Sequence, residues 1–114
     1  MLRTLHKIAS YLIIALGGAH MLFTLHDYDS FDLDALWFFG AGVAIVFAGF
    51  INVILLGAAG RERTARVLAV ITNIFCLVMF AAALALLRQP QVFVGILLFA
   101  VATTGVLLPA RGRP

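Results

Sequence analysis

Charged side chains are scarce in this sequence. Lysine, arginine, aspartate and glutamate together make up 11% of the 114 residues, whereas apolar residues make up 64%. Soluble domains carry about 25% charged residues, and a chain of this length cannot cover a water-exposed surface with so few. The same scarcity excludes a disordered chain, which combines low hydrophobicity with high charge. We therefore expect a membrane protein that forms one domain over residues 1–114.

Cysteine is almost absent as well. Cys76 is the single cysteine, which excludes an intrachain disulfide and a paired-cysteine redox motif. The long apolar stretches also lack acidic and basic side chains, one of which proton-coupled pumps and exporters usually keep in the membrane. Membrane hydrolases need a nucleophile paired with a base, and His20, the histidine inside the predicted spans, has no carboxylate near it. We therefore expect no enzymatic activity and no catalytic residues.

The sequence does contain four long uncharged runs. They are 19, 26, 21 and 22 residues long and are separated by short charged or polar breaks. A helix that crosses the hydrocarbon core needs about 20 mostly apolar residues, and it satisfies its own backbone hydrogen bonds in lipid. The predicted fold is all-α, a polytopic four-transmembrane-helix bundle. Its spans are expected at about residues 8–26, 35–58, 66–87 and 90–109.

The first run has some features of a secretory signal peptide. Arg3 and Lys7 precede it, and small residues follow at 17–19. The apolar region of a signal peptide is about 7–15 residues long, whereas this run continues to Leu25. We therefore expect it to be retained as the first spanning helix.

Basic residues are distributed unevenly among the segments outside the spans. Arg88 alone lies on one side, and the other side carries Arg3, Lys7, Arg61, Arg63, Arg66, Arg111 and Arg113. The positive-inside rule then predicts that both termini are cytoplasmic. The strong bias argues against a dual-topology protein, and it explains the pI near 9.8 without a nucleic-acid partner. Together with the short loops, it predicts a multi-pass protein of the bacterial inner (plasma) membrane.

Small and polar residues recur at helical spacing in each predicted span. Lipid tails are as apolar as leucine, so spanning helices associate where small residues allow close approach and polar side chains bond across the interface. We expect these seams to face one another in a compact bundle. They comprise Ser10, Gly17, His20 and Thr24; Gly42, Ile45, Gly49, Asn52 and Leu56; Ala65, Ala69, Thr72, Asn73, Cys76, Phe80 and Ala83; and Gly95, Ala102, Gly105 and Pro109.

A polar layer is predicted in the cytoplasmic half of the spans, formed by Ser10, Asn52, Thr72, Asn73 and Thr104. In a structural interpretation these side chains form interhelical hydrogen bonds of about 0.6 kcal/mol each and fix the register of the helices. In a functional interpretation they line a pocket for a lipid headgroup or a small polar solute. The sequence favours the structural interpretation and leaves the other open.

His20 is a candidate cofactor ligand in the outer half of the first span. An imidazole there can titrate or ligate a haem or chlorin, or it can stay neutral and bond to a neighbouring hydroxyl or carbonyl. His26 lies six residues further on, about 240° around the helix, and so cannot join it on one face. A second axial ligand would have to come from another chain. The sequence does not specify a cofactor.

Four aspartates gather in the first connection, at Asp27, Asp29, Asp32 and Asp34. A calcium loop requires the pattern D-x-[DN]-x-[DN]-G, and Phe31 at the fifth position breaks it. No metal site is predicted from this pattern, although a looser cation site stays open. We expect a solvated loop in which one aspartate caps the second helix.

These features predict a non-catalytic membrane protein that acts as a scaffold or accessory subunit. Its expected partners are the lipid bilayer and either further copies of itself, as a homo-oligomer, or a larger membrane complex. One alternative is a binding or transport protein with a lipid-like or small polar ligand at the Asn/Thr layer. Another is a pigment or haem binder that uses His20.

Overall fold

The computed structural model of the chain describes residues 2–86 and 88–107. It comprises α1 (Leu2–Asp27), α2 (Leu33–Ile54), the short 3₁₀ turn η1 (Ala58–Arg61), α3 (Arg63–Leu86) and α4 (Pro90–Leu107). These ranges are 90% helical and contain no strand. Each α-helix is long and apolar enough to cross a membrane. The prediction of an all-α chain with four such helices is confirmed.

Helix α1 starts well before the predicted span. The prediction began at residue 8 because Lys7 ends the uncharged run, whereas the helix extends back to Leu2. Arg3 and Lys7 are both exposed on this added turn and a half. A charged residue at the membrane surface ends the apolar run of the sequence, but the helix can continue past it. This extension brings His6 into α1.

Helix α2 ends four residues before the predicted limit at residue 58. Leu55 still donates its N–H to the Ile51 carbonyl, but the next two N–H groups bond only three residues back, to Val53 and Ile54. The chain then turns through η1 and enters α3 within eight residues. The predicted ends of the third and fourth spans, at residues 87 and 109, lie outside the described residues, as do Arg111 and Arg113 and the seam residue Pro109.

The starts of α2 and α4 follow from local sequence. Asp32 is the N-cap of α2, and its Oδ1 atom accepts a hydrogen bond of 2.9 Å from the Ala35 N–H. This confirms the expectation that an aspartate of the first connection caps the helix. Pro90 is the first residue of α4, a position whose N–H would make no hydrogen bond within the helix, so the lack of an N–H in proline costs nothing there. The Val92 N–H donates to the Gln89 carbonyl.

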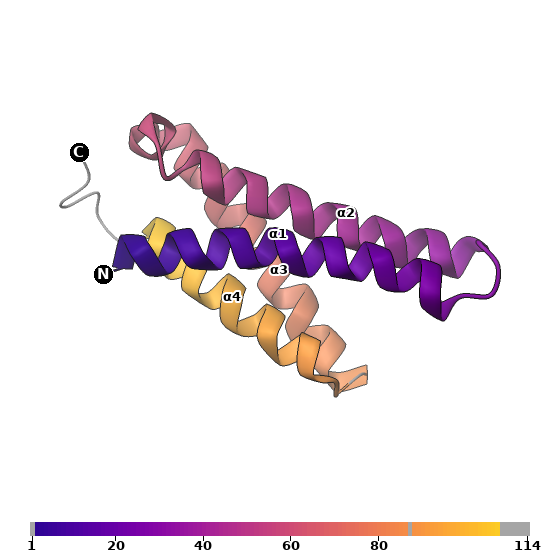
Figure 1. Cartoon of the computed structure of the whole chain (residues 1–114). Helices are drawn as coiled ribbons and strands as arrows, with labels where there is room; N and C mark the ends of the chain where they lie inside the picture. Colours follow the sequence, from indigo (N-terminus) through magenta and orange to yellow (C-terminus); the bar gives the residue numbers. More distant parts are fainter. Residues whose placement is uncertain (1, 87, 108–114) are drawn as a thin grey trace.

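The four helices form two antiparallel hairpins. Helices α1 and α2 pack along their length, α3 packs on α4, and α1 also packs on α4, whereas α2 and α3 make little contact. Figure 1 shows that the hairpins converge at the end holding the chain's N-terminus and η1, and diverge toward residues 28–32 and 88–89. The molecule is 49 Å long. The result is a bundle that is closed at one end and splayed at the other.

Glycines set the close approach of α1 and α2. A Cβ atom added to Gly17 would lie 2.7 Å from the Val46 backbone nitrogen and 2.8 Å from the Gly42 carbonyl oxygen. The same atom on Gly42 would lie 3.0 Å from the Gly17 oxygen. Both glycines belong to the predicted seams and both are buried. The backbones therefore touch where the sequence predicted small residues.

The largest hydrophobic core lies where α1, α2 and α4 meet. Its buried members are Ala9, Ile13, Ile45, Ala48, Leu98, Phe99 and Ala102, and α3 adds partly buried Cys76, Leu77 and Phe80 at its edge. Helix α3 is the least enclosed of the four. In its most apolar stretch of 18 residues 11% of the residues are buried, against 44% in the corresponding stretch of α4. Most of α3 thus presents side chains to the surroundings of the bundle.

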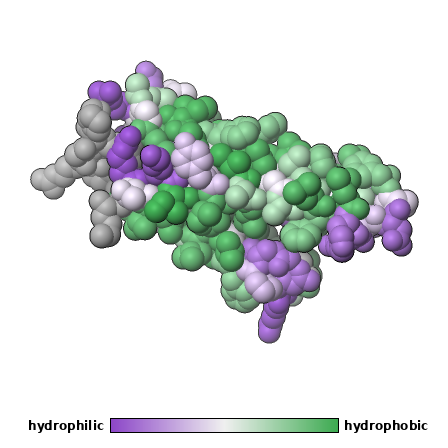
Figure 2. Space-filling view, viewed as in Figure 1, coloured by the Kyte–Doolittle hydropathy of each residue, from purple (hydrophilic) through white to green (hydrophobic). Residues whose placement is uncertain are grey.

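The surface divides into bands along the long axis. Hydrophobic residues cover the middle of the helices, and hydrophilic residues gather toward the ends (Figure 2). The acidic residues of the first connection share one end with Arg88, and the basic residues from Arg3 to Arg66 lie toward the other, near η1. This banding matches what four membrane-spanning helices require.

Candidate functional site

A buried polar network joins three helices near the closed end of the bundle. Asn52 of α2 and Asn73 of α3 exchange two side-chain hydrogen bonds, with N···O distances of 2.7 and 2.9 Å. His6 of α1 completes the network, with its Nε2 atom 3.1 Å from the Asn52 Oδ1 atom. All three side chains are fully buried. The contact that the sequence predicted between Asn52 and Asn73 is present.

Asn52 is the centre of this network and uses its whole bonding capacity. Its amide nitrogen donates to Asn73 and to the Ala48 carbonyl, the latter at 2.8 Å. Its amide oxygen accepts from Asn73 and faces His6. Because an amide oxygen only accepts, the His6 Nε2 atom is the donor and carries the proton. No donor or acceptor of Asn52 is left for a ligand, so the geometry supports a structural role.

The other members of the predicted layer do not join the network through their side chains. Ser10 is buried and donates to the His6 carbonyl at 2.7 Å. Thr72 donates to Leu68 and Thr104 to Ala100. Thr104 is exposed, whereas its neighbour Thr103 is buried and bonds to the Phe99 carbonyl. The predicted layer is therefore narrower than expected, because these hydroxyls satisfy themselves on the preceding turn of their own helix.

His6 is the member of the network that the sequence did not predict. It lies outside the predicted spans, yet it is fully buried and Gly105 of α4 packs against its ring. A Cβ atom on Gly105 would lie 2.7 Å from the His6 Cγ atom. The signal was present in the spacing, because His6 lies four residues before Ser10 and so continues the predicted seam of α1 toward its N-terminus. His6 thereby connects α1 to both α2 and α4.

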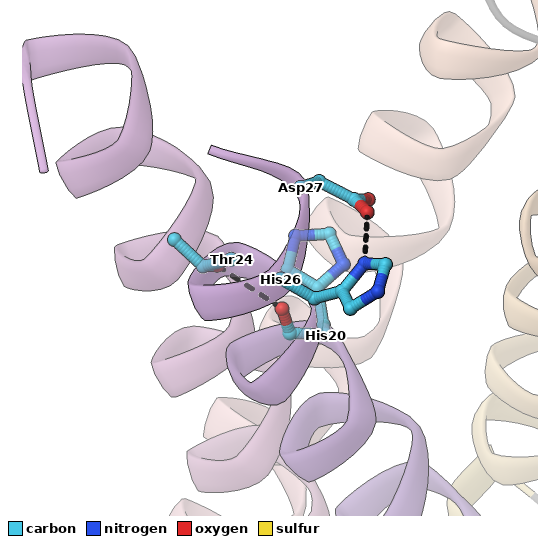
Figure 3. A network of polar contacts seen from close by, with 4 residues as sticks. All are labelled: His20, Thr24, His26 and Asp27. Carbon is cyan, nitrogen blue, oxygen red and sulfur yellow. Dashed lines mark hydrogen bonds and ion pairs between the residues drawn. The ribbon is translucent and has the colours of Figure 1, made fainter. Parts of the chain in front are cut away.

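His20 lies apart from this network, toward the splayed end. Its ring stacks on Phe38 of α2, with ring centroids 3.8 Å apart and planes inclined by 14°. The Nε2 atom is buried and has no hydrogen-bond partner in the part of the chain that the structure describes. The Thr24 hydroxyl donates to the His20 backbone carbonyl at 3.1 Å (Figure 3). It therefore does not bond to a nitrogen of the imidazole ring.

An apolar groove runs between the two hairpins beside His20. Its volume is about 330 Å³, and among the described residues that line it His20 is the one strongly polar residue. Small residues form part of its surface, from α2 at Ala41 and Ala44 and from α3 at Cys76 and Ala83. The remaining lining residues are Ile45, Phe75, Met79 and Phe80. We call this feature the His20 groove.

The acidic connection does not assemble a metal site within residues 2–86 and 88–107, where no three His, Cys, Asp or Glu side chains cluster closely enough. Asp32 is engaged as the α2 cap. Asp27 pairs with His26 at 3.0 Å on the exposed end of α1, as Figure 3 shows.

Comparison of the whole chain with protein-family models, curated proteins and solved structures found no match. The chemistry of the His6–Asn52–Asn73 network and of the His20 groove therefore carries the functional argument.

Proposed function

We propose that this chain is a small non-catalytic integral membrane protein that serves as an accessory subunit, with a transmembrane helix of a partner protein seated in the His20 groove. The observation that carries the proposal is the combination found in this groove. Small residues lie open to the bilayer there, next to a buried imidazole nitrogen that has no partner within the chain's described part.

The groove suits a helix because of how helices associate in lipid. Small residues let two backbones approach closely, and a polar side chain bonds across the interface. Ala41 and Ala44 are exposed on α2 and provide the first property, and His20 Nε2 provides the second.

The polar groups inside the bundle support a non-catalytic role. The amides of Asn52 and Asn73 and the ring of His6 bond to one another, so they hold helices together instead of facing a substrate. Such bonds are modest in membranes, at about 0.6 kcal/mol on average. Their concentration at one point still fixes the register of three helices.

The proposed setting is the inner (plasma) membrane of a bacterium, with both termini in the cytoplasm. The basic end of the bundle would then face the cytoplasm, as the positive-inside rule requires. A test uses Cys76→Ser as background, with single cysteines introduced at exposed Ser30 and Ala58. A membrane-impermeant maleimide applied to spheroplasts should label position 30 and spare position 58. The opposite pattern would reverse the topology.

The accessory role is tested by co-purification in mild detergent followed by native mass spectrometry. Wild type should carry a partner subunit, and Ala44→Trp should release it by filling the groove. Ala82→Trp is the matched control, because Ala82 is exposed on α3 and does not line the groove. Equal release by both variants, or a wild-type protein that is strictly monomeric and alone, would refute the proposal. Dimers of the chain alone would assign the groove to a second copy.

A second candidate function is a pigment or haem site at His20. It is favoured by the same nitrogen atom, since a buried imidazole without a partner can supply one axial ligand. The protein would supply an apolar cradle and orient the ring through Phe38. An absorption spectrum of the purified protein decides this, before and after haem is added. A colourless protein that stays colourless, or a band that survives His20→Phe, would remove the candidate.

A further inference from the structure

A second hollow lies on α3 at the opposite end from the His20 groove. Its volume is about 500 Å³, and it lies between the first turns of α3 and the described end of α4. Two arginines line it, Arg63 and Arg66, and the rest of the lining is aliphatic: Val67, Val70, Ile71, Val106 and Leu107. We propose that this hollow binds one anionic phospholipid, with its phosphate on the arginines and its acyl chains on the aliphatic wall.

The arginines are not neutralised by carboxylates within the described ranges. The one ion pair found there joins His26 to Asp27 at the far end of the bundle. Glu62 is exposed and contributes its backbone carbonyl, which accepts from the Arg66 N–H. No acidic residue is among the described residues that line the hollow. Two positive charges one helical turn apart therefore face the same space.

Arg66 supplies the more specific observation. Its side chain is half-buried, and its Nε atom is buried with no hydrogen-bond partner among residues 2–86 and 88–107. A buried N–H group without an acceptor is unfavourable, so the site is incomplete without a ligand. The guanidinium fork matches two phosphate oxygens, and the N-terminal end of α3 adds a favourable dipole for an anion.

The aliphatic wall identifies the phosphate as one carried by a lipid. Val67 and Ile71 are exposed on α3 and continue the hollow onto the hydrophobic surface of the bundle. A lipid at this depth places its phosphate at the basic end and its chains along these side chains, as in basic pockets between spanning helices. Free phosphate would use the arginines alone. This inference does not depend on the His20 groove.

The test measures lipid retention by native mass spectrometry. The protein is released from nanodiscs that contain equal amounts of phosphatidylglycerol and phosphatidylcholine. Wild type should retain one phosphatidylglycerol with a preference of about tenfold or more, and Arg63→Gln or Arg66→Gln should lower that retention by about tenfold. Arg61→Gln is the matched control, because Arg61 is exposed in the same connection and does not line the hollow.

Each outcome decides the proposal. Retention that is unchanged in Arg63→Gln, or lowered equally in Arg61→Gln, would show general attraction to basic residues and overturn it. Equal retention of phosphatidylcholine would do the same. Displacement of the lipid by equimolar inorganic phosphate would assign the site to a free anion. Arg63 is exposed, so Arg63→Gln keeps the test valid if Arg66→Gln fails to fold. Arg66→Lys, which keeps the charge without Nε, should fall between wild type and Arg66→Gln.

Discussion

Replacing Gly17 with alanine should weaken the bundle, whereas the same change at Gly18 should not. A Cβ atom at Gly17 meets two backbone atoms of α2, the Val46 nitrogen at 2.7 Å and the Gly42 oxygen at 2.8 Å. Backbone atoms of a packed helix cannot swing aside as a side-chain tip can, so α1 and α2 must separate. A Cβ atom at Gly18 has no neighbour within 4 Å.

The comparison isolates the helix contact because the two glycines are neighbours in one helix. The gain in helix propensity from glycine to alanine, about 1 kcal/mol in water, is nearly the same at both positions and cancels in the difference. What remains is the cost of overpacking, about 1–3 kcal/mol. Gly17→Ala should therefore be less stable than Gly18→Ala by that amount.

The assay is reversible unfolding of the purified protein in mixed micelles with increasing SDS, followed by circular dichroism. Gly42→Ala should repeat the effect from the other side of the same contact, with Gly40→Ala as its control, since Gly40 also faces open space. The double variant Gly17→Ala/Gly42→Ala should cost less than the sum, because one separation of the helices relieves both clashes. Equal stability of Gly17→Ala and Gly18→Ala would refute the α1–α2 contact described above.

Three further predictions use the same unfolding assay. Asn52→Leu should cost about 2 kcal/mol and Asn73→Leu about 1 kcal/mol, because Asn52 makes about twice as many side-chain bonds; equal costs would contradict its central position. Asp32→Ala should cost about 1 kcal/mol by removing the α2 cap, and Asp32→Asn should restore most of it. Gly95→Ala should cost about 1–3 kcal/mol, because its Cβ would clash with the Phe80 ring. Adding Phe80→Leu to this variant should recover stability. A double variant that is less stable than Gly95→Ala alone would exclude this contact.

The number and type of helices could be predicted from the sequence because lipid imposes a length and a composition on each span. The seam glycines could be predicted for the same reason: Gly17, Gly42 and Gly105 fall at helical spacing and are buried. These features depend on local pattern alone. They require no knowledge of which helix packs on which.

The polar network could be predicted only in part, because it depends on the rotation and ends of helices. The uncharged run ends at Lys7, so the predicted span leaves out His6, although the helix continues through Lys7 without interruption. The predicted polar layer includes Thr104 because of its depth in the span. Thr104 nevertheless lies two positions beyond buried Ala102, about 200° further around α4, and is exposed. The depth of a residue along its span can be predicted from the positions of the charged residues. The direction in which its side chain points can be known only once the helix that packs against it is known.

The His20 groove could not be predicted at all, because it arises from the angle between the hairpins. Helices α2 and α3 make little contact with each other, and their side chains bond directly at Asn52 and Asn73. In the same region His6 contacts Gly105, and further along the bundle the hydrophobic core of α1, α2 and α4 also joins the hairpins. The two contacts of the polar network lie toward the closed end, where the hairpins converge. The network thus holds α2 and α3 together at the closed end, and the same two helices supply most of the lining of the groove toward the splayed end.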